Sequence, residues 1–210
     1  MTRFFRTAVM AACVLVAGCA ARNEDLSDLP PMGNFLLGHI IVVDEEAEVG
    51  PLSRQAEPEQ WKGALTDALD ARLRGYQGDK FYHVAVAVEG YILAVPGVPL
   101  VASPKSALIV TAKVWDDEKG APINDEAKQF TVFESVSPDT LLSSGLTRSK
   151  EEQIADLSRN AARAIHNWML ENIAWFGGDA TTLPVLEGAV EAAPAAEPAP
   201  IELPEPTTDA

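Results

Sequence analysis

The longest regular pattern in the chain is an alternation of bulky and small side chains over residues 81–95 (FYHVAVAVEGYILAV). Successive residues of a β-strand point to opposite faces of a sheet, so the pattern predicts one long strand and therefore a sheet. One face of this strand carries Tyr82, Val84, Val86 and Val88. The other face carries His83, Ala85, Ala87 and Glu89. Because the second face is made mainly of small residues, we expect a helix to lie close against it.

Three further segments have the composition of strands. Residues 35–43 (FLLGHIIVV) form an apolar, β-branched run that is typical of a strand with both faces covered. We expect His39, within that run, to be an interior residue and not a ligand. Residues 107–115 and 129–133 predict two more strands, and the turn-forming residues between them predict a hairpin connection: DDEKG at 116–120.

Acidic residues occur in two places where a cation site has to be considered. Residues 44–46 (DEE) follow the first strand, but neighbouring side chains on an extended chain point in opposite directions, so we interpret them as a solvated cluster. The acidic turn at 116–120 lacks the spacing of an EF-hand loop, which needs Gly at its sixth position and Glu at its twelfth. The sequence therefore predicts no metal site.

Two segments have helical periodicity. Pro58 opens the first, which ends near Gly75 and has an apolar residue at every fourth position: Trp61, Leu65, Leu69 and Leu73. Ser149 and Glu152 form a capping box at the start of the second, which ends at Gly177-Gly178. Its apolar face holds Ile154, Leu157, Ala161, Ile165, Trp168 and Met169. Its polar face holds Asp156, Arg159, Asn160, Arg163 and Asn167. His166 neighbours the polar face, so we expect it to be exposed to solvent.

These elements come in the order β-α-β-β-β-α. The order predicts an α+β fold with a mixed or antiparallel sheet of about four strands and two helices packed on one face.

The connection at residues 94–104 (AVPGVPLVASP) is unusual because no charge occurs between Glu89 and Lys105. Its prolines prevent a regular strand ladder. The segment either folds back over the end of the sheet and is buried, which is the commoner use, or meets a membrane or a partner protein. In the second case the contact residues are Val95, Val98, Leu100 and Val101.

The N-terminus has the three parts of a secretory signal. Arg3 and Arg6 are basic, residues 7–17 are uncharged and apolar, and small residues then lead to Cys19. The apolar run is about eleven residues, which is short of the roughly twenty needed for a membrane-spanning helix. We therefore expect residues 1–18 to be a signal peptide that is removed.

Val16-Ala17-Gly18-Cys19 resembles the lipobox of bacterial lipoproteins. In that family the thiol receives a diacylglycerol, the chain is cleaved before the cysteine, and the new amine is acylated. The resemblance implies that Cys19 is a lipid-bearing N-terminus; the alternative is an ordinary signal peptide with Cys19 as a free thiol after the cut. Ala20, in place of the Asp that favours inner-membrane retention in the family, implies the periplasmic face of the outer membrane.

Removing the signal takes two arginines from a chain of net charge −15 and leaves the mature protein at −17. Such a protein is repelled by nucleic acid, so we expect no nucleic-acid partner. Cys13 leaves with the signal and Cys19 is acylated, which excludes a disulfide or a thiolate metal site in the mature chain.

Polar segments flank the predicted domain of residues 35–176. Residues 19–34 include Pro30-Pro31, have no periodicity and are interpreted as a tether. Residues 177–210 are rich in Ala, Pro and Glu and contain no Lys or Arg. Such a composition cannot bury enough apolar surface to offset the entropy of ordering, so we expect a disordered acidic tail.

The element order behind a lipobox resembles small envelope-assembly and transport-auxiliary lipoproteins of Gram-negative bacteria, including the lipoprotein partner of the lipopolysaccharide-assembly barrel. The resemblance covers roughly residues 35–175 and rests on element order, so it transfers no binding residue. It implies a non-enzymatic scaffold in outer-membrane assembly or transport, with an envelope protein as partner. The alternative is a periplasmic module that binds a small apolar ligand between helices and sheet.

No enzyme motif is present. The chain has no G-x-S-x-G, H-E-x-x-H, phosphate-loop or G-x-G-x-x-G pattern, and its three histidines, at positions 39, 83 and 166, are far apart in sequence. We therefore expect no catalytic residues and no cofactor apart from the covalent lipid on Cys19.

Overall fold

The computed structural model describes residues 29–44, 46–95, 106–135, 148–179 and 181. Two α-helices are present in these residues, α1 (Pro58–Leu73) and α3 (Lys150–Glu171), followed by the short 3-10 helix η1 (Ile173–Phe176). The strands are β1 (Phe35–Val43), β2 (Glu48–Val49), β3 (Lys80–Ile92), β4 (Ala107–Asp116), β5 (Ala121–Pro122) and β6 (Lys128–Phe133).

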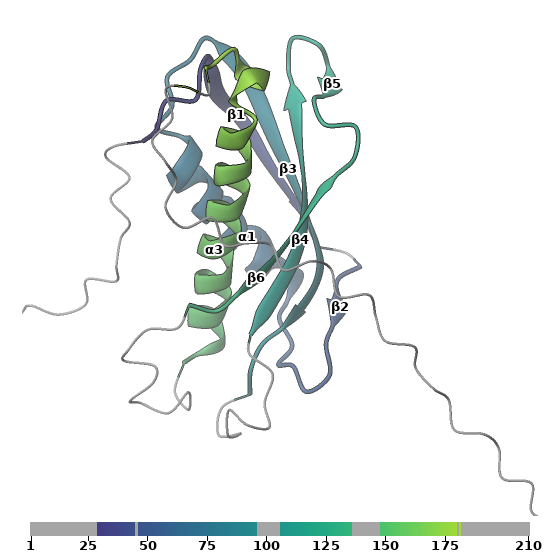
Figure 1. Cartoon of the computed structure of the whole chain (residues 1–210). Helices are drawn as coiled ribbons and strands as arrows, with labels where there is room; N and C mark the ends of the chain where they lie inside the picture. Colours follow the sequence, from purple (N-terminus) through teal and green to yellow (C-terminus); the bar gives the residue numbers. More distant parts are fainter. Residues whose placement is uncertain (1–28, 45, 96–105, 136–147, 180, 182–210) are drawn as a thin grey trace, which may run out of the picture.

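The strands form one mixed sheet in the described part of the chain (Figure 1). β3 lies at its centre, with β1 parallel to it on one side and β4 antiparallel on the other. β2 continues beside β3 as a second parallel segment, and β5 and β6 both pair antiparallel with β4. The α+β prediction is confirmed, although the sheet has six strands where about four were predicted. The two-residue strands β2 and β5 account for the difference.

The two long helices begin where Pro58 and the Ser149–Glu152 capping box predict. Glu57 and Gln60 form a capping box ahead of α1, with Pro58 in its first turn. At α3 the Ser149 hydroxyl accepts a hydrogen bond from the Glu152 N–H at 3.1 Å, and the Glu152 carboxylate accepts one from the Ser149 N–H at 2.8 Å. These reciprocal bonds satisfy backbone donors that a helix start leaves free.

The core lies between the helices and one face of the sheet. The whole predicted stripe of α1, from Trp61 to Leu73, is fully buried, as are Leu157 and Ile165 of α3. At the end of the sheet where β3 begins, four aromatic rings from distant segments pack together: Phe35, Tyr76, Tyr82 and Phe176. Large buried side chains therefore fill the space between the two layers.

The helices cover the opposite face of β3 from the one predicted. Tyr82, Val84, Val86 and Val88 are the buried residues, and the small residues Ala85 and Ala87 point away from both helices. The expectation that both faces of β1 are covered was also wrong, because Ile41 and Val43 are exposed. Small residues left room for a helix on one face, but the bulky face buries more apolar area, and the helices pack there.

Four polar residues have environments that differ from the predictions. His39 is exposed, not interior, and His166 is buried, not exposed. Asp156, expected on the polar face of α3, is also buried. Asp44 is buried as well, so the predicted solvated cluster is wrong for that member, and burial raises the pKa of its carboxyl against the opposing effect of Lys62.

The folded part of the chain extends beyond β1 and α3. Met32 is buried in the core, three residues before the predicted domain start. The Asn34 N–H donates to the Phe176 carbonyl at 2.7 Å, which joins the two ends of the domain. α3 ends at Glu171 and η1 continues to Phe176, where Gly177 adopts a left-handed conformation with φ of 72°. Glycine takes this conformation without steric cost, which explains the end of the helical segment there.

Candidate interaction surface

The face of the sheet opposite α1 and α3, here called the open face, has the features of an interaction surface. In the described residues neither helix covers it (Figure 1). Its exposed large apolar side chains come from four strands: Ile41 (54% exposed), Val43 (45%), Phe81 (51%), Trp115 (39%) and Phe133 (55%). Single exposed apolar residues are common on proteins, but several on adjacent strands are typical of a binding surface.

The middle of the open face is a shallow hollow of about 190 Å³. Ala85, Ala87 and Thr111 contribute to its lining with small side chains, and the larger Ile41, Lys113 and Trp115 also line it. Sites for drug-sized ligands usually have about 300–1,000 Å³ and enclose most of the ligand. The hollow is therefore better suited to the protruding side chains of a protein partner.

Opposite charges lie on either side of a row of residues across the open face. The row runs from Val43 through Ala87 and Thr111 to Gln129, which are paired in register on β1, β3, β4 and β6. On one side, Lys113 of β4 is paired with Ala85. On the other side, Glu89 follows Val88 at a bulge in β3 and accepts a hydrogen bond from the Thr111 hydroxyl at 2.6 Å. The open face thus carries a cation and an anion on opposite sides of its middle row, and the apolar Trp115 lies farther from that row than Lys113.

A histidine pair forms the edge of the open face near the start of β3. The His39 N–H donates to Nδ1 of His83 at 2.9 Å, and Nε2 of His83 bonds the Asp117 carboxylate at 2.9 Å. Gly38 lies so close that a Cβ on it would be 2.6 Å from the His83 ring. Both nitrogens of His83 are engaged, so this residue stabilises the bulge in β1 and has no free nitrogen for a metal.

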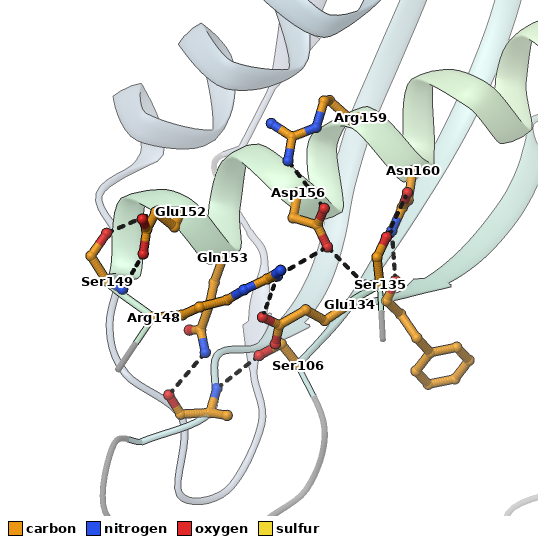
Figure 2. A network of polar contacts seen from close by, with 12 residues as sticks. Ser106, Glu134, Ser135, Arg148, Ser149, Glu152, Gln153, Asp156, Arg159 and Asn160 are labelled. Atoms are coloured by element: carbon orange, nitrogen blue, oxygen red, sulfur yellow. Dashed lines mark hydrogen bonds and ion pairs between the residues drawn. The ribbon is translucent and has the colours of Figure 1, made fainter. Parts of the chain in front are cut away.

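A polar network holds the chain on either side of residues 96–105 and 136–147 at one end of the sheet (Figure 2). Arg148 pairs with Glu134 at 2.8 Å and with Asp156 at 3.5 Å, and the Ser135 N–H donates to Asp156 at 2.8 Å. Nearby, the Ala94 N–H donates to the Ser106 hydroxyl at 3.1 Å.

Gln153, in the first turns of α3, donates from its amide to the Ala94 carbonyl at 3.4 Å. Ala94, at the start of the apolar connection, is therefore held to α3, and Ser106, on the other side of that connection, is held through its bond with Ala94 (Figure 2). Val95 begins that loop and is 37% exposed. The other predicted contact residues, Val98, Leu100 and Val101, lie outside the described residues, as does the predicted lipidation residue Cys19.

No cluster of three or more potential metal-binding residues occurs among the residues that the structure describes. Within the same residues, neither helix is long and apolar enough to cross a bilayer.

No protein-family model matches the chain, and no curated protein matches it. Solved structures that resemble this chain weakly include a candidate lipoprotein of Caulobacter crescentus CB15, with 16% identity over 66% of this chain and 92% of that one, at a TM-score of 0.35. A Xanthomonas campestris protein of the family DUF330 has 13% identity over 68% of this chain and 90% of that one, at a TM-score of 0.36. A minor lipoprotein of Acinetobacter baumannii has 17% identity over 61% of this chain and 92% of that one, at a TM-score of 0.27. These values are too low to transfer a function to this chain.

The sequence patterns did not single out the residues of the open face as a surface. Ile41 and Val43 were interpreted as covered on both faces of their strand, and Ala85 and Ala87 as residues against which a helix packs. The alternation correctly showed which residues share a face of the sheet. The alternation did not show which face the helices cover, because that depends on how the connections cross the sheet.

Proposed function

We propose that the chain is a bacterial envelope lipoprotein, held by lipid on Cys19 at the periplasmic face of the outer membrane, where it acts as a non-enzymatic scaffold that binds another envelope protein. The anchor rests on Val16-Ala17-Gly18-Cys19 behind a basic and an apolar segment. Diacylglycerol and an N-acyl chain together give a membrane attachment far stronger than a single acyl chain.

The open face is the observation that carries the scaffold role. A parallel strand pair usually has both of its faces covered, yet β1 and β3 present Ile41 and Val43 to solvent beside Ala85 and Ala87. A protein partner bound there removes this apolar surface from water, and each Å² buried contributes about 25 cal/mol. We assign the partner-binding surface to the open face.

The ligand-binding alternative has less support. It needs space between the helices and the sheet, and that layer is occupied by fully buried side chains that include Trp61, Leu65 and Leu157. The hollow on the open face is on the other side of the sheet and is small for an enclosed ligand.

Cys19→Ala tests the anchor. The variant is expected to incorporate no radiolabelled palmitate and to leave the membrane fraction or stay uncleaved, because residue 19 is then unable to carry lipid. Labelling and fractionation of both proteins from envelope preparations provide the measurement. Ala20→Ser, which leaves the cysteine intact, is the matched control and should be labelled like the wild type. Equal labelling of wild type and Cys19→Ala would contradict the lipoprotein assignment.

A further inference from the structure

The distribution of charge and size over the open face suits one occupant in particular. The row Val43, Ala87, Thr111 and Gln129 divides the face into two halves. One half carries the Lys113 ammonium, and the other carries the Glu89 carboxylate. The two groups lie at similar distances from the row, about 7 Å along the strands at roughly 3.3 Å per residue.

We propose that the open face binds a second copy of this chain, related to the first by a two-fold axis that runs along this row. The proposal rests on the proposed function, because it names the partner of the surface assigned there. In a two-fold interface each contact occurs twice, so a surface must be complementary to itself. A face with a cation in one half and an anion in the other meets this condition.

Rotation about the row brings opposite charges together. It places Lys113 of one copy across from the β3–β4 region that carries Glu89 of the other, and the reciprocal pair forms at the same time. In the single chain Lys113 donates to the Asp125 carbonyl at 3.0 Å and Glu89 accepts from Thr111, so neither group has a charged partner in these bonds. Both remain exposed enough to pair across the interface, since both strand positions face away from the helices.

Side-chain sizes agree with the same axis. Trp115 lies four residues beyond Thr111 on β4, and Ala107 lies four residues before it. The rotation therefore sets the exposed Trp115 of each copy opposite the small Ala107 of the other. Large side chains facing small ones let two sheets approach closely. Along the axis itself, the small Ala87 of each copy faces its own equivalent.

The net charge of −17 opposes association of two copies, but it acts mainly at long range. At physiological ionic strength charges more than about 8 Å apart are largely screened. The apolar side chains of the open face and the reciprocal charge pairs act at contact, where screening is weaker.

The experiment uses the full-length, lipid-anchored protein in isolated envelopes. Because the mature chain has no cysteine other than acylated Cys19, a single new thiol reports its own neighbours. Ala87→Cys and, separately, Val43→Cys place that thiol on the proposed axis, so mild oxidation should give a disulfide-linked dimer on a non-reducing gel. Asp67→Cys, on the exposed side of α1, is the matched control and should stay monomeric.

The charge pair is tested in the Ala87→Cys background. Lys113→Glu alone and Glu89→Lys alone should each lower the dimer yield by about tenfold, because each turns two attractive pairs into two repulsive ones. Co-expression of the two variants with different tags should restore a mixed dimer, since each introduced charge then faces its opposite. A Lys113→Glu/Glu89→Lys double variant should dimerise like the parent.

Three outcomes would overturn the inference. The first is a dimer yield for Ala87→Cys and Val43→Cys that does not exceed the Asp67→Cys control. The second is no recovery on mixing the two charge variants. The third is that the same thiols join a different envelope protein, in which case the second-copy proposal falls and the scaffold function stands. If Cys19→Ala retains its lipid label, the anchor assignment fails independently of the dimer result.

Discussion

Trp61→Ala is expected to lower the free energy of unfolding by about 3–5 kcal/mol, a large share of the stability of a domain of this size. Trp61 is the largest fully buried side chain among the described residues, and its ring centroid lies 5.2 Å from that of Tyr91. Its indole N–H has no hydrogen-bond partner within the same part of the chain, so the loss comes from packing and burial. Urea unfolding of a chain that begins at Ala20 provides the measurement.

Phe133→Ala is the matched control for this truncation. It also removes an aromatic ring, but one that is 55% exposed on the open face. Substitutions at exposed positions usually change stability by less than about 0.5 kcal/mol. If both variants were destabilised equally, the helices would not cover the face of the sheet that the structure assigns to them.

The core that contains Trp61 could be predicted from sequence because its residues repeat at regular intervals. A four-residue interval in α1 and a two-residue interval in β3 each mark residues that share a face, and those sets are indeed buried together. Pro58 located the start of α1 and the Ser149–Glu152 capping box that of α3 for the same reason, since each signal lies within a few residues. Strand β2 has only two residues and depends on its pairing with Gly90 and Tyr91 of β3, so no local sequence pattern predicted it.

The open face could not be predicted from the same patterns. Periodicity groups residues on a face but does not say which face meets the helices, and the small residues Ala85 and Ala87 suggested the wrong one. Its charge arrangement depends on strand register, which places Lys113 beside Ala85 from a segment 28 positions away in the sequence. The lipid anchor differs from the open face, because a contiguous motif of four residues is enough to predict Cys19. The structure does not describe that part of the chain.

Buried polar residues were the other failure, and His166 shows why. It lies on the boundary between the two faces of α3, where helical periodicity alone cannot decide its exposure. In the structure its Nε2 is 2.7 Å from the Tyr76 hydroxyl, a partner 90 residues away. Tyr76 follows α1, so the pair forms only when the two helices pack. A polar residue can be buried at low cost when such a partner is present.

His166 should make the fold sensitive to acid. Burial, reinforced by the nearby Arg72 guanidinium, lowers the pKa of His166 from 6.5 to about 4. Because the pKa of His166 is lower in the folded protein than in the unfolded chain, the unfolded chain binds the proton more readily. Its contribution to stability is therefore present above pH 6.5 and is lost as the pH falls toward 4. A shift of this size corresponds to about 3 kcal/mol at 1.36 kcal/mol per pH unit.

His166→Gln tests this contribution, because glutamine keeps hydrogen-bonding capacity next to Tyr76 but does not titrate. Carboxylates also titrate in this range, so the informative quantity is the difference in unfolding free energy between wild type and variant. That difference should shift by about 3 kcal/mol against the wild type between pH 7.5 and pH 4. Urea titrations at several pH values supply it. Parallel stability curves for the two proteins would rule out His166 as the source of acid sensitivity.

Tyr76→Phe separates burial from the hydrogen bond as the cause. It removes the hydroxyl that contacts His166 but leaves the ring packed against Phe35 at 5.8 Å. Since burial is the main cause of the lowered pKa, this variant should lose stability at every pH and still become weaker between pH 6.5 and 4. If the pH dependence disappeared with the hydroxyl, the hydrogen bond and not the apolar surroundings would be what keeps His166 neutral in the folded protein.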